Sequence, residues 1–420
     1  MQWTTFSRIY GPLQLLCLLS IVGGGMSEQG EQAAVAHKHA FANNLYKAVA
    51  EEHRKDGQTK NLIMSPLSLE IVLSAAGMGA RGRTQEQISA AIGLPFDLET
   101  MRGRYAPILS GLESDAIKLR VATHMFVQEK FDLKQNFVNG SREVFMCGVG
   151  EVDYIAKPEE ALSTINGWVN EKTEGLIKEL LTSDDITLDT RLVLANAIYF
   201  KGKWAQPFEK ERTRKDKFNL LDGTQVDVDM MYVEKRFRYG YIQDLKAEVL
   251  ELPYEGDKLS MVILLPFADS SIFELESKVS SPDFDLSELL ANHTYKQEVT
   301  VYLPKFKLEL KTDLEEVLAK MGMAHMFTDN ADFSGITDVP PGLKVGKVVQ
   351  KAFIEVSEEG TEAAASTVMM MMKPASEIIY QRAPKIFIVD HPFIFYLAGS
   401  VDCNIVFIAT CVGQVGMHSM

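Results

Sequence analysis

Hydrophobic and polar residues follow a helical period in the first half of the chain and strand-like runs in the second. Apolar residues recur four apart over residues 41–49, which predicts an amphipathic helix that ends at Gly57. Ser65 followed by Pro66 predicts the start of a second helix, because serine caps helix N-termini and proline fits the first helical position. The period of residues 165–181 predicts a third helix.

The strand signals are of three kinds. Near-continuous apolar runs at 191–200 and 259–266 predict strands buried on both faces. Residues 299–310 alternate between apolar and polar, but the alternation slips by one residue after Pro304, which predicts a bulge. Residues 391–410 predict two strands joined by a turn. Together these segments predict a single α+β domain, with helices packed on large, mostly antiparallel sheets.

The N-terminus has the layout of a cleaved secretory signal. Arg8 precedes an apolar run from Leu13 to Val22, and small residues follow it. The run is too short to span a bilayer, so residues 1–25 predict a signal peptide and a secreted, extracellular protein that does not bind membranes. Two Asn-X-Ser/Thr triplets agree with export and predict glycosylation at Asn139 and Asn292.

The net charge of the chain limits the kinds of molecule that it can bind. With 43 basic against 57 acidic residues, the chain carries a formal charge of −14, which argues against a nucleic-acid partner. Residues 201–217 are the exception, because they contain seven basic residues and only three acidic ones. This cluster is a candidate for weak polyanion binding, although a run of this kind is more often a solvated face.

The sequence contains none of the motifs that would signal catalysis or a cofactor. It has no G-x-S-x-G, no H-E-x-x-H, no phosphate-binding glycine loop and no C-x-x-C, so no enzyme, metal or cofactor is expected. His37 and His39 lie two residues apart, on different faces of a helix, and are expected to be solvated. After the signal peptide, Cys147, Cys403 and Cys411 remain, and this odd number excludes a fully paired disulfide framework.

Residues 357–368, SEEGTEAAASTV, are small yet lie between apolar, strand-like segments. In a strand, alternate residues share a face, and one face here would carry only small uncharged side chains. The segment could therefore enter a sheet between two existing strands, with Gly360 as the hinge. The residues of that face are Thr361, Ala363, Ala365 and Thr367.

The EEGTEAAAST segment resembles the reactive-loop hinge of the serpin family. Other segments resemble serpins in the same order along the chain, namely NLIMSPLS, LSAAGMGARGRTQEQI, INGWVNEKTEGLI, LANAIYFKGKWAQPFE, VLELPYEGDKLSMVILLP, LPKFKLE, LAKMGMAHMF and DHPFIFYL. The resemblance implies one serpin domain over residues 37–416, with three β-sheets and about eight to nine helices. It also implies an exposed reactive-centre loop at about 358–384.

The same resemblance implies a secreted, monomeric inhibitor of serine-type endopeptidases. A protease would cut the loop, form an acyl-enzyme and be trapped when the loop inserts into the main sheet. The alternative is a non-inhibitory serpin-fold carrier, chaperone or storage protein, and the uncharged hinge favours inhibition. The implied hinge residues are Glu358, Gly360, Thr361, Glu362, Ala363, Ala364 and Ala365.

Two positions compete for the reactive bond. Counting fourteen residues from the hinge glycine gives Pro374, whereas reading back from the following strand gives Arg382–Ala383. Eight further strand residues would lengthen the tether by roughly 26 Å, so a protease held at Arg382 would escape distortion. Trapping by an elastase- or chymotrypsin-like enzyme is therefore expected near 374, and turnover by trypsin-like enzymes at Arg382. The reactive region comprises Met372, Lys373, Pro374, Ala375 and Ser376.

The chain departs from the family pattern in two places. The family usually has histidine where this chain has Gln350, and that residue would join a sheet-opening network with Ser65, Ser68 and Asn196. Glutamine can also donate and accept hydrogen bonds. The family's last strand normally ends in glycine, a basic residue and valine, whereas this chain has Ala409 and Thr410 at the regular spacing and Gly413-Gln414-Val415 at an offset.

Overall fold

The structure is a computed structural model that describes residues 39–55, 60–111, 117–340, 342–359, 383–400 and 403–413. Its α-helices are α2 (Ala40–His53), α3 (Pro66–Gly79), α4 (Gly82–Ile92), α5 (Leu98–Gly111), α6 (Gln135–Phe145), α7 (Pro158–Lys172), α8 (Ile272–Val279), α9 (Leu286–His293) and α10 (Glu315–Leu318). Short 3-10 or π turns are η1 (Ser183–Asp185), η2 (Lys210–Arg212), η3 (Ala319–Met323) and η4 (Ala324–Phe327).

The strands are β1 (Leu62–Met64), β2 (Ile117–Gln128), β3 (Gly148–Val152), β4 (Leu192–Gly202), β5 (Arg214–Asn219), β6 (Gln225–Ile242), β7 (Ala247–Pro253), β8 (Leu259–Pro266), β9 (Tyr295–Pro304), β10 (Phe306–Asp313), β11 (Lys347–Val356), β12 (Lys385–Ile388), β13 (Phe393–Gly399) and β14 (Ile405–Cys411). The two predicted apolar strands correspond to β4 and β8, in which nearly every residue is buried.

The described strands form two hydrogen-bonded sheets. One has five strands in the order β10-β11-β4-β2-β3, and the other follows the path β1-β14-β13-β8-β7-β6-β9-β12, with β5 beside β6. The second sheet unites what the resemblance counts as two sheets, because β6 is 18 residues long. One part of β6 pairs with β5 and β9, and its last residues also pair with β7.

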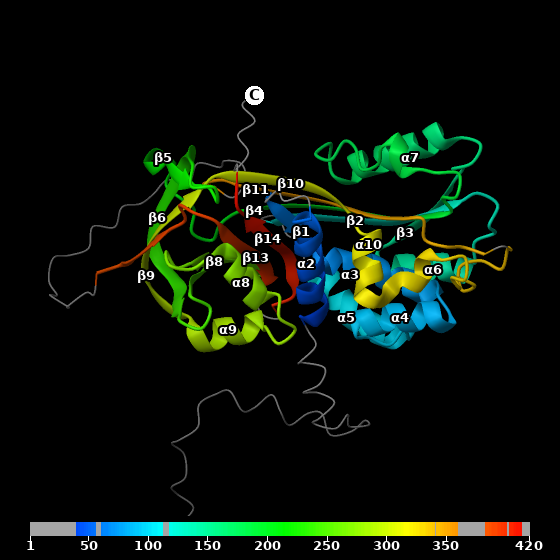
Figure 1. Cartoon of the computed structure of the whole chain (residues 1–420), viewed down its shortest axis with the longest axis horizontal. Helices are drawn as coiled ribbons and strands as arrows, with labels where there is room; N and C mark the ends of the chain where they lie inside the picture. Colours follow the sequence, from blue (N-terminus) through cyan, green and yellow to red (C-terminus); the bar gives the residue numbers. More distant parts are fainter. Residues whose placement is uncertain are drawn as a thin grey trace, which may run out of the picture. The chain divides into compact units, whose positions relative to one another are not determined.

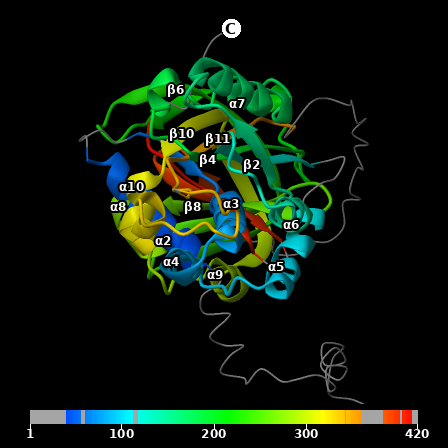
Figure 2. The ribbon, with the colours of Figure 1, turned by 90° about the vertical axis from the view of Figure 1, so that its right-hand side faces the viewer.

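The five-stranded sheet is covered on both faces. On one face its side chains join the main hydrophobic core with α2, α3 and the second sheet, and on the other they pack against α7. Figures 1 and 2 show α7 on one side of β2, β4, β10 and β11, and α3 on the other. A strand added to this sheet would therefore be buried on both faces.

The predicted start of the second helix is confirmed, whereas the third helix differs at both ends, because α7 begins at Pro158 rather than at residue 165. Ser65 caps α3, with its hydroxyl accepting the Ser68 N–H, and Pro66 is the first helical residue, as predicted. The third helix was predicted to run to residue 181, but α7 ends at Lys172. The reason is local, because Thr173 Oγ1 accepts the Ile177 N–H at 3.0 Å and Gly175 adopts a positive φ of 83°.

The slip in alternation after Pro304 marks a change of sheet, which corrects the predicted bulge. Strand β9 ends at Pro304 in the second sheet, and β10 begins at Phe306 in the five-stranded sheet. Lys305 connects them, and its backbone N–H donates to the Asp229 carbonyl at 2.8 Å. The apolar positions of β10 therefore begin one residue later than the alternation of β9 would place them.

His39 is buried, which corrects the expected solvated position. Its Nε2 lies 3.0 Å from the Cys403 carbonyl oxygen, and its Nδ1 lies 3.5 Å from Asp285 Oδ1. The residue precedes α2 and faces elements about 250 to 360 positions away, which no local pattern reveals. His37 and Gly57 lie outside the described residues.

The unusual end of β14 has a structural counterpart on α2. The Thr410 hydroxyl and the Tyr46 hydroxyl donate to Glu276 Oε1 at 2.9 and 3.0 Å. The guanidinium of Arg54 pairs with the other carboxylate oxygen of Glu276. The buried Glu276 carboxylate is thus paired with Arg54, which directly follows α2, and bonded to the hydroxyl of Thr410.

We predict that Gly240→Ala destabilises the second sheet. A Cβ at this position would lie 2.2 Å from the His293 backbone carbonyl oxygen, which cannot move without shifting the end of α9. Overpacking of this kind costs roughly 1–3 kcal/mol, so the apparent melting temperature should fall by several degrees. The control is Gly103→Ala on exposed α5, where no atom lies within 4 Å of the added Cβ and no fall is expected. Equal melting temperatures for the two variants would refute the close approach.

Candidate functional site: the seam between strands β4 and β11

Strands β4 and β11 pair in parallel at the centre of the five-stranded sheet. The Cα partners run from Lys347 with Val193 to Ile354 with Phe200. Each strand is antiparallel to its other neighbour, β11 to β10 and β4 to β2. We term the β4–β11 boundary the seam, its Ile354 end the hinge end and its Lys347 end the far end. A strand entering the seam against their direction would be antiparallel to both.

The chain is connected in a way that suits such a strand. Strand β11 ends at Val356, on the hinge end, and the small residues of 357–368 follow directly in sequence. Antiparallel neighbours can be joined by a short turn, whereas parallel neighbours need a long crossover connection. The segment after β11 is therefore the part of the chain that can enter the seam without a crossover.

The inner face of the seam is held by a buried polar network that includes all four predicted residues. Gln350 and Asn196 are Cα partners across the seam, and Gln350 Nε2 donates to Asn196 Oδ1 at 2.9 Å. The Ser65 N–H donates to Gln350 Oε1 at 2.8 Å, and Gln350 Nε2 donates back to the Ser65 carbonyl at 2.9 Å. Ser68 Oγ donates to Asn196 Oδ1 at 2.7 Å. The start of α3 is thus bonded to both strands.

The network extends to a residue that sequence reasoning missed. Asn196 Nδ2 donates to Thr123 Oγ1 at 3.3 Å, and Thr123 is the Cα partner of Asn196 on β2. Strand β2 also contains Lys118, Arg120, His124 and Gln128, so no distinct sequence signal points to Thr123. All members of the network are buried, so each hydrogen bond that opens must be replaced by another.

Backbone and indole bonds close the hinge end. After β11, the Ser357 carbonyl accepts from the Trp204 indole N–H at 2.8 Å, and the Glu358 carbonyl accepts from the Phe208 N–H at 2.9 Å. Trp204 itself stacks on Tyr254 with ring centroids 4.3 Å apart. The residues that follow β11 are therefore bonded to those that follow β4, and this contact prolongs the closed seam.

The Glu358 side chain is a second fastening at the same end. It accepts from the Thr213 hydroxyl at 2.8 Å and pairs with Lys305 Nζ at 2.9 Å. Burial tends to raise the pKa of Glu358, but hydrogen bonds from Lys305, its own backbone N–H and Thr213 hold that pKa below the usual value. The carboxylate is therefore charged at neutral pH and joins β11 to the connection between β9 and β10.

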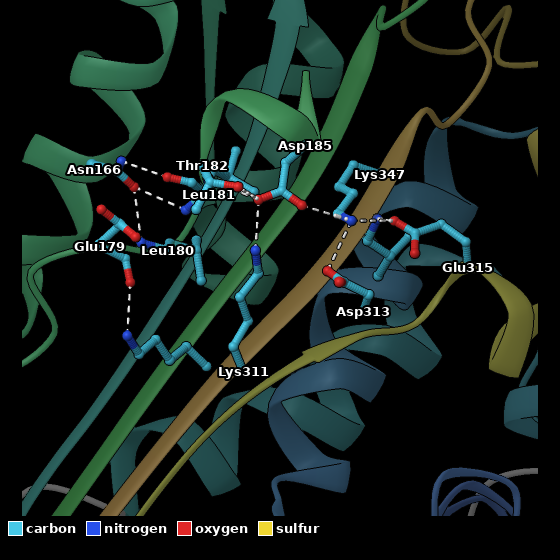
Figure 3. A network of polar contacts seen from close by, with 12 residues as sticks. Asn166, Glu179, Leu180, Leu181, Thr182, Asp185, Lys311, Asp313, Glu315 and Lys347 are labelled. Carbon is cyan, nitrogen blue, oxygen red and sulfur yellow. Dashed lines mark hydrogen bonds and ion pairs between the residues drawn. The ribbon is translucent and has the colours of Figure 1, made fainter. Parts of the chain in front are cut away.

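A third fastening lies on the outer face, where residues 173–191 connect α7 to β4. Figure 3 shows Asp185 of this connection between two lysines of the neighbouring strands. Lys311 Nζ of β10 donates to Asp185 Oδ2 at 2.6 Å, and Lys347 Nζ of β11 lies 2.9 Å from Asp185 Oδ1. Lys347 also pairs with Asp313 at 2.8 Å.

The charges in this outer cluster stabilise one another. Burial tends to raise the pKa of Asp185, but hydrogen bonds from Lys311, the Thr182 N–H and Lys347 lower it well below the usual value. Burial tends to lower the pKa of Lys347, but Asp313 and Asp185 raise it above the usual value. Both groups are therefore charged at neutral pH, and the ion pairs span from the connection to β10 and β11.

The comparisons with known proteins agree on one family. The family model described as "Serpin (serine protease inhibitor)" matches residues 36–413. This chain is a serpin. The leukocyte elastase inhibitor of Bos taurus is 38% identical over 390 residues, which cover 90% of this chain and 98% of that protein. An uncharacterized serpin-like protein of Methanosarcina acetivorans is 37% identical over 372 residues, which cover 88% of this chain and 85% of that one.

A solved structure supports the same assignment. Serpin48, described as a highly specific serpin in the insect Tenebrio molitor, superposes with a TM-score of 0.80 at 35% identity. The match covers 93% of this chain and 100% of that one. The predicted serpin fold is thus confirmed, with helices packed on large sheets in an α+β arrangement.

The reactive loop of this serpin lies mostly outside the described residues. Glu358 is described and bonded as above, and Ala383 is exposed just before β12. The remaining predicted hinge and bond residues belong to the undescribed part, namely Gly360, Thr361, Glu362, Ala363, Ala364, Ala365, Met372, Lys373, Pro374, Ala375, Ser376 and Arg382. The signal peptide also lies outside the described residues.

The other predicted surface sites lie on the described surface. Asn139 on α6 and Asn292 on α9 are both exposed, so a glycan could reach either. Most basic side chains of residues 201–217 have acidic neighbours within ion-pair distance. These pairs are Lys210 with Glu359, Arg212 with Glu209, Arg214 with Asp216, Lys215 with Asp229 and Lys217 with Asp227.

The described residues also bear on membrane, metal and disulfide chemistry. Among them, no helix has the length and apolar character needed to cross a membrane. No group of three or more histidine, cysteine or acidic side chains in that part of the chain is placed to hold a metal ion. Cys147, Cys403 and Cys411 are all buried free thiols.

We predict that Gln350→Ala loosens the closed seam. The substitution leaves the buried Ser65 N–H without its acceptor, at a cost of about 1–3 kcal/mol, and removes one of the two donors to Asn196 Oδ1, which keeps Ser68 Oγ. A calorimetric scan of the intact protein should therefore show a lower apparent melting temperature, corresponding to a loss of roughly 1–3 kcal/mol of stability. The matched variant Gln350→His keeps a donor and an acceptor and should lose less. An alanine variant as stable as the histidine variant would contradict the role of the network.

We also predict a pH-dependent contribution from Glu358. Because the pKa of Glu358 is lowered on folding, its contribution is complete above the unfolded-state pKa of about 4.3 and is lost as the pH falls through the folded-state pKa. Glu358→Gln should therefore lower the apparent melting temperature at pH 7. The expected loss of stability is only about 1–2 kcal/mol, because solvent partly screens the exposed Lys305. The gap to the wild type should narrow steadily as the pH falls below about 4.3.

The neighbouring variant Glu359→Gln provides the control for this measurement. Glu359 pairs with the exposed Lys210, and a pair of this kind contributes less than about 1 kcal/mol. A gap between wild type and Glu358→Gln that stayed constant from pH 7 to pH 3.5 would show that the carboxylate charge is not what holds the hinge end.

Proposed function

We propose that this serpin is a secreted inhibitor of serine-type endopeptidases that acts as a suicide substrate rather than as a catalyst. The protease serine attacks a loop bond, the new amine leaves, and an ester joins the enzyme to the loop. The loop then enters the seam before water hydrolyses the ester, and the attached protease is carried toward the far end. Distortion of the protease prevents the release step.

The observation that carries this proposal is the parallel pairing at the seam. Eight residue pairs, Lys347–Ile354 with Val193–Phe200, form one ladder while the seam is closed. An inserted strand replaces this single ladder with two, a net gain of about eight hydrogen bonds worth roughly 0.5–1.5 kcal/mol each. The gain of roughly 4–12 kcal/mol is comparable to the whole stability of an ordinary domain, and it supplies the driving force.

The residues that would enter fit the site. Inserted side chains would face the main core on one side of the sheet and the α7 core on the other. On one face the segment offers only Thr361, Ala363, Ala365 and Thr367, which are small and uncharged. A charge there would be buried without a partner, at a cost of several kcal/mol. This absence of charge favours inhibition over a carrier or storage role.

The target follows from the loop and from the relatives. A relative named leukocyte elastase inhibitor supports an elastase-like protease as the target. The apolar Met372 near the expected bond suits an elastase- or chymotrypsin-like pocket. Secretion is proposed from residues 1–25. Weak polyanion binding through residues 201–217 remains part of the proposal, limited by the carboxylates that already pair with most of the cluster.

We predict that elastase or chymotrypsin forms an SDS-stable complex with this serpin. Mass spectrometry of the released C-terminal peptide should place its first residue between Lys373 and Ser376, and trypsin should cut mainly at Arg382 with turnover. Cleavage of the loop should also raise the melting temperature sharply, because the sheet gains a strand. An unchanged melting temperature after cleavage would favour a non-inhibitory role. A stable complex whose peptide begins at Ala383 would contradict the predicted bond.

A matched pair of variants tests which face of the inserted strand is buried. Thr361→Arg places a charge on the small face and should convert the inhibitor into a substrate while leaving the intact fold unchanged. Glu362→Arg changes the opposite face, which already carries a charge, and should retain most of the covalent complex. Full complex formation by Thr361→Arg would show that this face is not buried on insertion.

A further inference from the structure

Residues 173–191, termed here the strap, run across the outer face of the seam. Asn166 of α7 holds the strap at one end, accepting the Leu180 and Leu181 N–H groups at 2.8 and 3.0 Å. Leu180 and Leu181 pack in the same buried cluster as Val349 of β11 and Ala195 of β4. The strap therefore covers apolar side chains on both sides of the seam.

The strap is part of one side of the seam but is bonded to the other. Its last residue directly precedes β4, so it is covalently continuous with the β4 side. Its carboxylate, Asp185, pairs with Lys347 of β11 and Lys311 of β10, which both belong to the opposite side. Lys351 of β11 adds a bond to the Glu179 carbonyl at 2.9 Å. Moving β11 away from β4 would therefore break these bonds or displace the strap.

The position of Asp185 along the seam is informative. Lys347 is the far end of β11, and the Thr182 N–H and hydroxyl hold the Asp185 carboxylate in place at 2.7 and 3.1 Å. The side chain of Asp185 is only 9% exposed, so water can replace little of what its lysines provide. A strand entering from the hinge end would reach this fastening last.

We propose that Asp185 latches the far end of the seam and limits how fast an entering strand completes its insertion. This inference rests on the proposed function, because the latch acts only if a strand enters the seam. It assigns a role to one carboxylate that is distinct from the inner Gln350 network and from the Glu358 fastening at the hinge end. Because the latch is made of ion pairs, removing a single charge should release it.

The test measures insertion without any protease. A synthetic peptide with the sequence of residues 361–370 is mixed with the intact full-length serpin, and its uptake is followed by tryptophan fluorescence and by the rise in melting temperature. Asp185→Asn should take up the peptide roughly three- to tenfold faster than the wild type, because charge-assisted bonds no longer oppose separation. Lys311→Gln breaks only the β10 bond and should give an intermediate rate.

Two controls separate a latch from general destabilisation. Asp184→Asn removes the same charge from the neighbouring exposed residue and should leave the uptake rate within about twofold of the wild type. The double variant Asp185→Asn with Lys311→Gln should match Asp185→Asn alone, because Lys311 acts through Asp185. If the two substitutions acted independently, the increase in uptake rate of the double variant would instead be the product of the two single increases.

The outcomes distinguish the latch from the proposed function. If the wild type takes up the peptide and Asp185→Asn does so no faster than Asp184→Asn, the latch is wrong while insertion stands. The latch is also wrong if the increase in uptake rate of the double variant is the product of the two single increases. If neither peptide nor loop cleavage raises the melting temperature of the wild type, both the latch and the proposed function are wrong. Should Asp185→Asn fail to fold, the comparison of Lys311→Gln with Asp184→Asn decides the same question.

Discussion

Strands β4 and β11 pair in parallel, although the segment that follows β11 in sequence would pair with each of them in the antiparallel sense. This pairing leaves the sheet one strand short of the arrangement in which its hydrogen bonding would be greatest. Core packing favours an added strand that turns a face of small, uncharged side chains toward the core. Under the proposed function, the other features of the site keep this boundary closed in the intact protein and let it open after cleavage.

The three fastenings of the seam are all polar, and this has a physical reason. The hydrogen bonds across the seam weaken steeply once donor and acceptor separate or lose their alignment, so they resist the first opening of β4 from β11. Gln350 holds the inner face, Glu358 the hinge end and Asp185 the far end. Such bonds can also be exchanged for new ones, so the open sheet is not left with a permanent penalty. A boundary held in this way is closed firmly yet opens as a unit.

The two departures from the family pattern are accommodated by local exchange of partners. Gln350 supplies a donor and an acceptor in one uncharged side chain, so the inner network keeps its bonds without a titrating imidazole. At the end of β14, Thr410 donates to Glu276, and Arg54, which directly follows α2, pairs with the same carboxylate.

The sequence by itself determined the strand segments within 191–200, 259–266, 299–310 and 391–410, where α3 begins, and which hinge residues are small and uncharged, because these properties depend on local alternation, capping and size. It also indicated that Ser65, Ser68, Asn196 and Gln350 act together, through resemblance to a family. Only the tertiary structure decided that α7 ends at Lys172, that the chain changes sheet at Lys305 and that His39 is buried. It alone revealed the Asp185 bridge, since that side chain meets lysines more than 120 residues away. Such partners are fixed by packing between distant segments, and no local pattern records them.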